Sequence, residues 1–176
     1  MKHLIKLLCG STLCLFFGCM QQDQQMKNQL EDNIKIAKDS WGGFTQHDAS
    51  KMAPYFADNV ILVDYGSPKP DTGWAQFQQT YQAYVTAFPD GKPSFEGDVA
   101  HGDMVVLQWR VVGTNTGPLM NMPATNKSVD THGCTVYHLV NGKIVHLWQY
   151  WDRAGFMRQL GMMPEPGQPV GKEKKK

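Results

Sequence analysis

Cysteine is scarce in the body of this chain, because three of its four cysteines lie within the first nineteen residues and only Cys134 lies beyond them. This distribution excludes a disulfide framework inside the domain. The four histidines after residue 100 lack the close spacing of a zinc motif, and no cysteine pair accompanies them. The chain also lacks a glycine-rich phosphate loop followed by lysine, and it lacks a nucleophile motif of acyl-transfer enzymes. The residues therefore predict neither a metal site nor a phosphate-binding loop.

Positive charge is also scarce between the two ends of the chain. The sequence has 17 basic and 16 acidic side chains, but Lys2, Lys6 and four lysines of residues 172–176 account for six of the basic ones, and Glu173 for one acidic one. Residues 20–171 therefore carry 11 basic against 15 acidic side chains, a net charge of −4. Such a domain does not attract nucleic acid, and no basic stripe with interleaved aromatic residues is present. We interpret the terminal lysines as a solvated tail.

The first nineteen residues read MKHLIKLLCGSTLCLFFGC and predict an export signal. Lys2 and Lys6 supply a positive start, and a short apolar run follows at residues 7–17. This run is too short for a helix that spans a membrane, which needs about 20 apolar residues.

A small residue followed at once by cysteine, Gly18-Cys19, ends the apolar run and resembles the lipobox of bacterial lipoproteins. The resemblance implies that residues 1–18 are a lipoprotein signal peptide and that Cys19 carries lipid. Lipid chains at this position would anchor the protein to a membrane. Met20, in place of an aspartate, implies a location in the cell envelope, at the outer membrane and facing the periplasm. Ordinary secretion with cleavage nearby is the alternative.

Composition divides the remainder of the chain into three parts. Residues 19–30 are rich in glutamine and predict a flexible tether after the lipidated cysteine. Residues 31–163 have the apolar patterns of one globular domain. Residues 164–176 combine prolines, glycines and lysines and predict a disordered tail.

Hydrophobic periodicity predicts an α+β domain in which helices, a strand and another helix precede an antiparallel meander and a terminal helix. Asn141-Gly142 is a strong signal for a two-residue turn between the last two strands. The expected helices cover residues 31–46, a short segment from Asp48, residues 74–88 and residues 152–160. The expected strands cover residues 59–65, 93–101, 104–114, 129–140 and 143–151.

The second half of the chain contains three segments with distinctive motifs, AFPD at 87–90, QWRVVGTNTGPLMNMPATNKSV at 108–129 and NGKIVHLWQYWDRAGFMRQLG at 141–161. These segments resemble the SnoaL-like polyketide cyclases, also called SnoaL-like ester cyclases. They contain the tryptophan strand, the Gly-Thr turn, the Pro-x-Thr corner and the Asp-x-x-Gly and Gln-Leu-Gly motifs in the family's order. Residues 31–87 agree only in the order of elements and in Asp48 and Asp64.

The resemblance implies an NTF2-like cone, in which a strongly curved antiparallel sheet packs against N-terminal helices and encloses a small-molecule pocket. Members of the family commonly form homodimers and use no metal or organic cofactor. The characterised cyclases close a ring by an aldol reaction, with an aspartate as general acid/base. Many other members have no assigned reaction.

Asp152 is the candidate general acid/base for such chemistry. An aldol closure needs a proton removed next to a carbonyl and a proton given to the developing oxyanion, and one shielded carboxylate can do both. Asp152 ends the last strand among tryptophan and tyrosine side chains, which are surroundings that raise a carboxyl pKa. Its position before a helical pattern equally predicts a helix N-cap. His138 and His146 are candidate partners, and a structural role in the strand is the alternative for each.

Strand pairing across the Asn141-Gly142 turn places Tyr137 opposite His146 on one aromatic face, unless a bulge exchanges the later members. We expect this face to line the pocket together with polar and aromatic residues of other elements. Core packing is the alternative role for the aromatic residues. The candidate pocket residues are Asp64, Trp74, Tyr81, Trp109, Tyr137, Trp148 and Tyr150.

Three functional hypotheses follow. The first is a cofactor-independent acid/base enzyme, of cyclase, isomerase or hydrolase type, that acts on a small apolar carbonyl compound. The second is a non-catalytic cell-envelope lipoprotein that binds a small apolar or aromatic ligand, and the third is a protein-interaction module. Val63 and Gln149 replace a histidine and an acid that relatives often carry, and export separates the protein from cytoplasmic polyketide precursors. Both observations argue against a literal polyketide cyclase.

Overall fold

The computed structural model describes the backbone of residues 4–167 and the side chains of residues 20–167. Its elements follow the predicted order, with the addition of a two-residue strand after the first long one. They are α1 (Leu4–Asp39), α2 (Gly42–Thr45), the 3-10 helix η1 (Ala49–Tyr55), β1 (Phe56–Asp64), β2 (Asp71–Thr72), α3 (Trp74–Ala87), β3 (Lys92–His101), β4 (Met104–Thr114), β5 (Ser128–Val140), β6 (Lys143–Trp151) and α4 (Arg153–Gln159).

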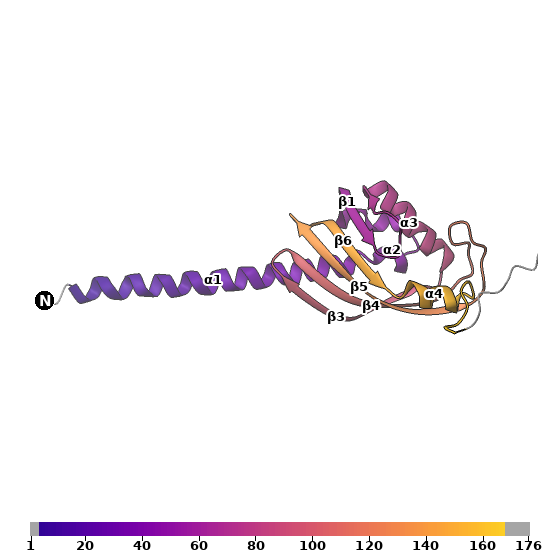
Figure 1. Ribbon diagram of the computed structural model, residues 1–176. Coiled ribbons are helices and arrows are strands. Elements are labelled where there is room, and N and C mark those ends of the chain that lie inside the picture. Colours follow the sequence, from indigo (N-terminus) through magenta and orange to yellow (C-terminus); the bar gives the residue numbers. More distant parts are fainter. Residues whose placement is uncertain (1–3, 168–176) are drawn as a thin grey trace, which may run out of the picture.

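One curved sheet of six strands forms the body of the domain. The strand order is β2-β1-β6-β5-β4-β3, in which β1 runs parallel to β6 and the other neighbours are antiparallel. Helices α2 and α3 pack over one face of the long strands, and α4 closes one end of the sheet (Figure 1). The α+β layout with a curved sheet and N-terminal helices is confirmed, and the parallel β1–β6 pair is the departure from an antiparallel sheet.

Helix α1 is continuous through residues 20–30, where composition predicts a flexible tether. Glutamine, lysine, methionine and leucine dominate this stretch and are good helix formers, so the helix extends beyond the domain (Figure 1). The end of α1 is fixed by Ala37, which is fully buried, and by Asn33, whose Nδ2 donates to the Gly102 carbonyl at 3.2 Å. Among residues 4–167, no helix is both long and apolar enough to cross a membrane.

The β5–β6 hairpin contains a bulge that changes the predicted pairing. The Asn141-Gly142 turn is present, with φ of 51° and 73°, and Leu139 pairs with Ile144 as expected. Beyond the bulge, His138 pairs with His146, and every later pair is shifted by one residue. The prediction that Tyr137 opposes His146 is therefore wrong.

Burial explains the bulge. Ile144 is fully buried and Leu147 is 2 % exposed, so both side chains face the core although they are three residues apart. Side chains of a regular strand alternate with a period of two, and one extra residue is needed to bring both to the same face. The interior face therefore combines Thr131, Thr135 and Tyr137 of β5 with Leu147, Gln149 and Trp151 of β6.

Tyr137 belongs to the core rather than to a binding surface. It is 2 % exposed, and its hydroxyl oxygen accepts a hydrogen bond from Trp41 Nε1 at 2.8 Å. Burial raises the pKa of Tyr137 to about 12, because an ionised phenolate would be desolvated there.

We expect Tyr137→Phe to change the alkaline stability of the protein. In the wild type, unfolded chains release the Tyr137 proton near pH 10, whereas folded chains release it only near pH 12. The protonated phenol therefore stabilises the fold below pH 10, and this contribution is lost as the pH rises from 10 to 12. The variant should lose about 1–2 kcal/mol at pH 7, where Trp41 Nε1 loses its acceptor, but should decline less between pH 10 and 12. Urea unfolding at pH 7, 10 and 11 measures both effects. Parallel pH curves for the two proteins would contradict the assignment.

Candidate functional site

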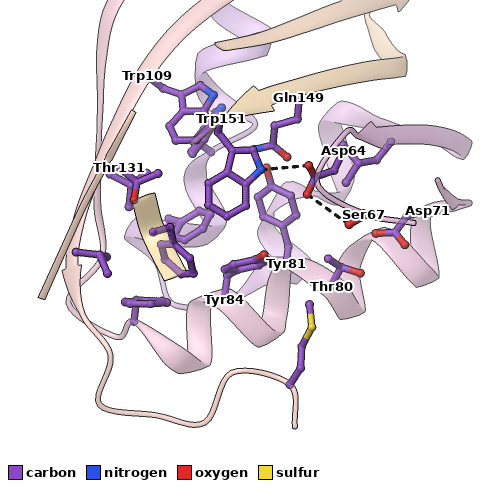
Figure 2. A pocket seen from close by; sticks show the side chains of 18 of the residues that line it. Asp64, Ser67, Asp71, Thr80, Tyr81, Tyr84, Trp109, Thr131, Gln149 and Trp151 are labelled. Carbon is purple, nitrogen blue, oxygen red and sulfur yellow. Dashed lines mark hydrogen bonds between the residues drawn. The ribbon is translucent and has the colours of Figure 1, made fainter. Parts of the chain in front are cut away.

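A cavity lies between the concave face of the sheet and the helices, and the space within it that is open to the centre of a water molecule is about 90 Å³. Most of its wall is apolar and aromatic, including Trp41, Phe44, Trp109 and Phe156. The polar side chains of the wall gather mainly where β1 ends and the following loop begins (Figure 2). They are Asp64, Ser67, Lys69, Asp71, Thr80, Tyr81, Tyr84, Thr131 and Gln149.

Asp64 is one of two carboxylates that line this cavity, the other being Asp71, and its side chain is only 13 % exposed. Its Oδ1 accepts hydrogen bonds from Trp151 Nε1 at 3.2 Å and from the backbone N–H of Gly66 at 2.8 Å. Its Oδ2 lies 3.5 Å from Ser67 Oγ and 3.8 Å from Arg153 Nη1. One oxygen is thus held by two donors, while the other has only longer contacts and can interact with a ligand.

The local sequence explains how Asp64 is held. The Gly66 and Ser67 amides turn back onto Asp64, at 2.8 Å from its Oδ1 and at 2.8 Å from its carbonyl oxygen. Arg153, at the start of α4, donates to the Gly66 carbonyl at 2.6 Å and packs so closely that a Cβ on Gly66 would lie 2.6 Å from Arg153 Cδ. Helix α4 therefore fixes the loop that presents the carboxylate.

Two further side chains face the same end of the cavity. Gln149 pairs with Asp64 across the parallel β1–β6 ladder, and Tyr81 projects from α3. Burial raises the pKa of Tyr81 well above its usual value, and interaction with Gln149 opposes this effect. Tyr81 therefore stays protonated at neutral pH and offers a hydroxyl donor beside a carboxylate and an amide.

Trp109 forms the wall on the β4 side of the cavity. Its ring lies directly over Gly133 of β5, where an added Cβ would be 2.2 Å from a ring carbon. Its Nε1 donates to Thr135 Oγ1 at 2.9 Å, and its ring lies 5.2 Å from that of Trp41. Because glycine has no Cβ, Gly133 leaves room for the indole of Trp109 in the cavity wall.

Asp152, the candidate acid/base from the sequence, lies outside this cavity. Its side chain is 68 % exposed and caps α4, because its Oδ1 accepts from the Gly155 N–H at 2.7 Å. Arg158 lies 3.9 Å from its other oxygen. The structure therefore favours the N-cap reading of Asp152 over the catalytic one.

His138 and His146 lie on the outer face of the sheet, away from the cavity. His138 Nε2 is 3.0 Å from Asp103 Oδ2. The ring of His146 stacks on Trp148 at 3.9 Å, and burial, followed by the charge of His138, lowers the pKa of His146. No group of three or more His, Cys, Asp and Glu side chains in the described part of the chain is arranged to hold a metal ion.

Of the seven candidate pocket residues, Asp64, Tyr81 and Trp109 line the cavity. Trp74 packs against Phe56 and Phe77 in the core. Trp148 and Tyr150 lie on the outer face, where the bulge has turned them. Three further residues of the cavity were not predicted from the sequence: Trp151, which the same shift brings into the cavity, Ser67 and Tyr84.

Comparison with known proteins identifies the family and the fold of the domain. The family model for SnoaL-like polyketide cyclases matches residues 34–160. A candidate SnoaL-like polyketide cyclase from Jannaschia sp. CCS1 superposes with a TM-score of 0.68 at 18 % identity, covering 76 % of this chain and 94 % of that one. A candidate polyketide cyclase from Acidithiobacillus ferrooxidans gives 0.60 at 25 % identity, covering 76 % and 96 %. TerC, co-crystallised with polyporic acid, gives 0.60 at 17 % identity, covering 74 % and 98 %. Curated protein sequences give no match.

Proposed function

Because the chain belongs to the SnoaL-like polyketide cyclase family, we propose that its cavity binds a small apolar carbonyl compound and that Asp64 acts on it as a cofactor-independent general acid/base. One observation carries the proposal: a partly buried carboxylate stands at the edge of an aromatic cavity. Among such walls a proton transfer is shielded from water, and the electrostatic effect of each polar group is larger than in solvent.

The proposed chemistry begins with proton transfer from the carbon next to the carbonyl to Asp64. The C–H electron pair forms a carbon–carbon double bond while the π pair of the carbonyl moves onto its oxygen, and the resulting enolate can be stabilised by hydroxyl or amide donors. Tyr81 and Gln149 supply such donors at this end of the cavity. The enolate then takes the proton back from Asp64 at the same or another carbon, or it attacks a second carbonyl carbon while Asp64 gives its proton to the new alkoxide. Return of the proton to the same carbon is hydrogen exchange, its delivery to another carbon of a conjugated enolate is isomerisation, and attack on the second carbonyl is ring closure.

Binding without chemistry is the second candidate function. It is favoured by the two donors that already hold Asp64 Oδ1, since they suit a fixed recognition group as well as a base. The co-crystal of TerC with polyporic acid supports a small organic ligand for either candidate.

Exchange of hydrogen for deuterium in a bicyclic ketone separates the two candidates. We expect the purified protein in D₂O to accelerate exchange at the carbon between the ring and the carbonyl of 2-tetralone, followed by proton NMR. Saturation of the rate with ketone concentration would show that the reaction takes place in a binding site. If the ketone binds, as measured by quenching of tryptophan fluorescence, and the exchange rate equals that of buffer, the acid/base proposal is wrong and the binding function remains.

We also propose that the domain is held at the cell envelope through lipid on Cys19, with residues 1–18 removed. Gly18-Cys19 after an apolar run supports this, and the side chains of residues 1–19 lie outside the described residues. We expect Cys19→Ser to abolish incorporation of an alkyne-labelled fatty acid in a Gram-negative host and to move the protein from the membrane fraction to the soluble fraction. Cys14→Ser is the matched control and should change neither. Unchanged labelling of the Cys19 variant would contradict the proposal.

A further inference from the structure

Thr131 presents a buried hydroxyl that has no hydrogen-bond partner among the residues that the structure describes. The residue is 7 % exposed and lines the cavity from β5. In Figure 2 it lies across the cavity from Asp64, with Trp151 and Tyr84 between them. A polar atom in this position is desolvated without compensation, which costs about 1–3 kcal/mol.

The surroundings of Thr131 offer nothing for its hydroxyl. Val129, two residues earlier on the same face, and Val111, its partner across the β4–β5 ladder, are apolar and also line the cavity. A valine would fill the same volume without an unsatisfied oxygen. Thr135, farther along the same face, differs because its Oγ1 accepts from Trp109 Nε1 at 2.9 Å. The two buried threonines of this face thus have different roles, and only the hydroxyl of Thr135 is accounted for by the fold.

We infer that Thr131 Oγ1 is a second recognition point for the ligand, at the opposite end of the cavity from Asp64. The oxygen has almost no accessible surface in the free protein, so a rotation about χ1 of Thr131 brings it to the ligand. This inference rests on the proposed function, because it needs a small molecule in the cavity. The ligand class that satisfies both ends is a flat ring system with one hydrogen-bonding group at the Asp64 end and another, a hydroxyl or carbonyl, at the far end. Aromatic rings of Trp151 and Tyr84 flank the space in between, which suits the unsubstituted middle of such a molecule.

Two naphthols test the inference. 2,6-Dihydroxynaphthalene carries a hydroxyl at each end, whereas 2-naphthol carries only one. We expect wild-type protein to bind the diol about tenfold more tightly in isothermal titration calorimetry, since the second hydroxyl satisfies Thr131. Equal affinities would overturn the inference while leaving the proposed function intact. If 2-tetralone binds and neither naphthol does, the inference is wrong and the proposed function stands; if none of the three compounds binds, both are wrong.

Two variants assign the preference to Thr131. Thr131→Val keeps the shape and removes the hydroxyl, so the diol and 2-naphthol should bind with equal affinity, while the melting temperature of the free protein should rise by about 2–4 °C. Thr131→Ser keeps the hydroxyl and should retain the preference for the diol. If Thr131→Val still prefers the diol by about tenfold, another group recognises the second hydroxyl and the inference is wrong. An unchanged or higher melting temperature excludes misfolding as the cause of lost discrimination.

Discussion

Asp64→Asn is expected to reduce the rate of deuterium exchange in 2-tetralone by about 10²- to 10⁴-fold. The amide has almost the shape of the carboxylate, and its oxygen can still accept from Trp151 Nε1 and the Gly66 N–H, so the site should keep its structure. The amide cannot take up a proton at neutral pH. The substitution therefore removes proton transfer by this side chain and keeps its hydrogen-bonding oxygen. The exchange rate under saturating ketone measures the chemical step, and calorimetry with 2-naphthol measures binding separately. Affinity should change by less than the rate.

Asp152→Asn is the matched control for this experiment. The two aspartates stand at the ends of adjacent strands, β1 and β6, but Asp152 is exposed and caps α4. Its amide variant keeps an oxygen for the Gly155 N–H, so we expect full exchange activity and stability within about 0.5 kcal/mol of the wild type. If Asp152→Asn abolishes exchange and Asp64→Asn does not, the assignment of the two residues must be reversed.

Gly133→Ala is expected to destabilise the domain by about 3 kcal/mol and to impair ligand binding. The new Cβ would lie 2.2, 2.6 and 2.7 Å from three ring carbons of Trp109, closer than nonbonded carbon atoms can approach. The ring cannot move away freely, because its Nε1 donates a hydrogen bond to Thr135 Oγ1 and its centroid lies 5.2 Å from that of the tilted Trp41 ring. Overpacking here forces either the strands apart or the indole into the cavity.

Gly97→Ala provides the control in the same sheet. The nearest atom to a Cβ at Gly97 is Oε1 of the flexible Gln108 side chain, at an ordinary contact distance of 3.5 Å. We expect this variant to unfold within about 1 kcal/mol of the wild type in urea and to bind 2-naphthol normally. A Gly133→Ala protein as stable as the Gly97→Ala protein would show that Trp109 does not hold the position described.

The sequence was most informative where one local rule dominated. Asn141-Gly142 fixed the hairpin turn, and β4 occupies residues 104–114, as its pattern predicted. The short helix predicted to begin at Asp48 is present as η1, and the carboxylate of Asp48 accepts from the Ser50 N–H at 2.9 Å. Such features depend on neighbours in the chain and need no knowledge of the fold.

The candidate site was harder to predict because it depends on a single inserted residue. The bulge before His146 is set by the joint burial of Ile144 and Leu147, a tertiary requirement that alternation in β6 does not reveal. Without it, Trp148 and Tyr150 point inward and Trp151 points outward. Asp64 was predicted as a pocket residue and not as the acid/base. Its carboxylate is held by Trp151, which is 87 positions away along the chain, and its loop by Arg153, which is 87 positions from Gly66.

Helix α1 holds residue 20 at a fixed distance from the domain. Its exposed stretch from Met20 to the buried Asn33 spans about 20 Å, since an α-helix rises about 1.5 Å per residue. A rigid helix, unlike a flexible coil of the same length, limits how closely the domain can approach the point at which residue 20 is held, and how far it can turn toward that point. An attachment at Cys19 would therefore determine the direction in which the cavity mouth faces.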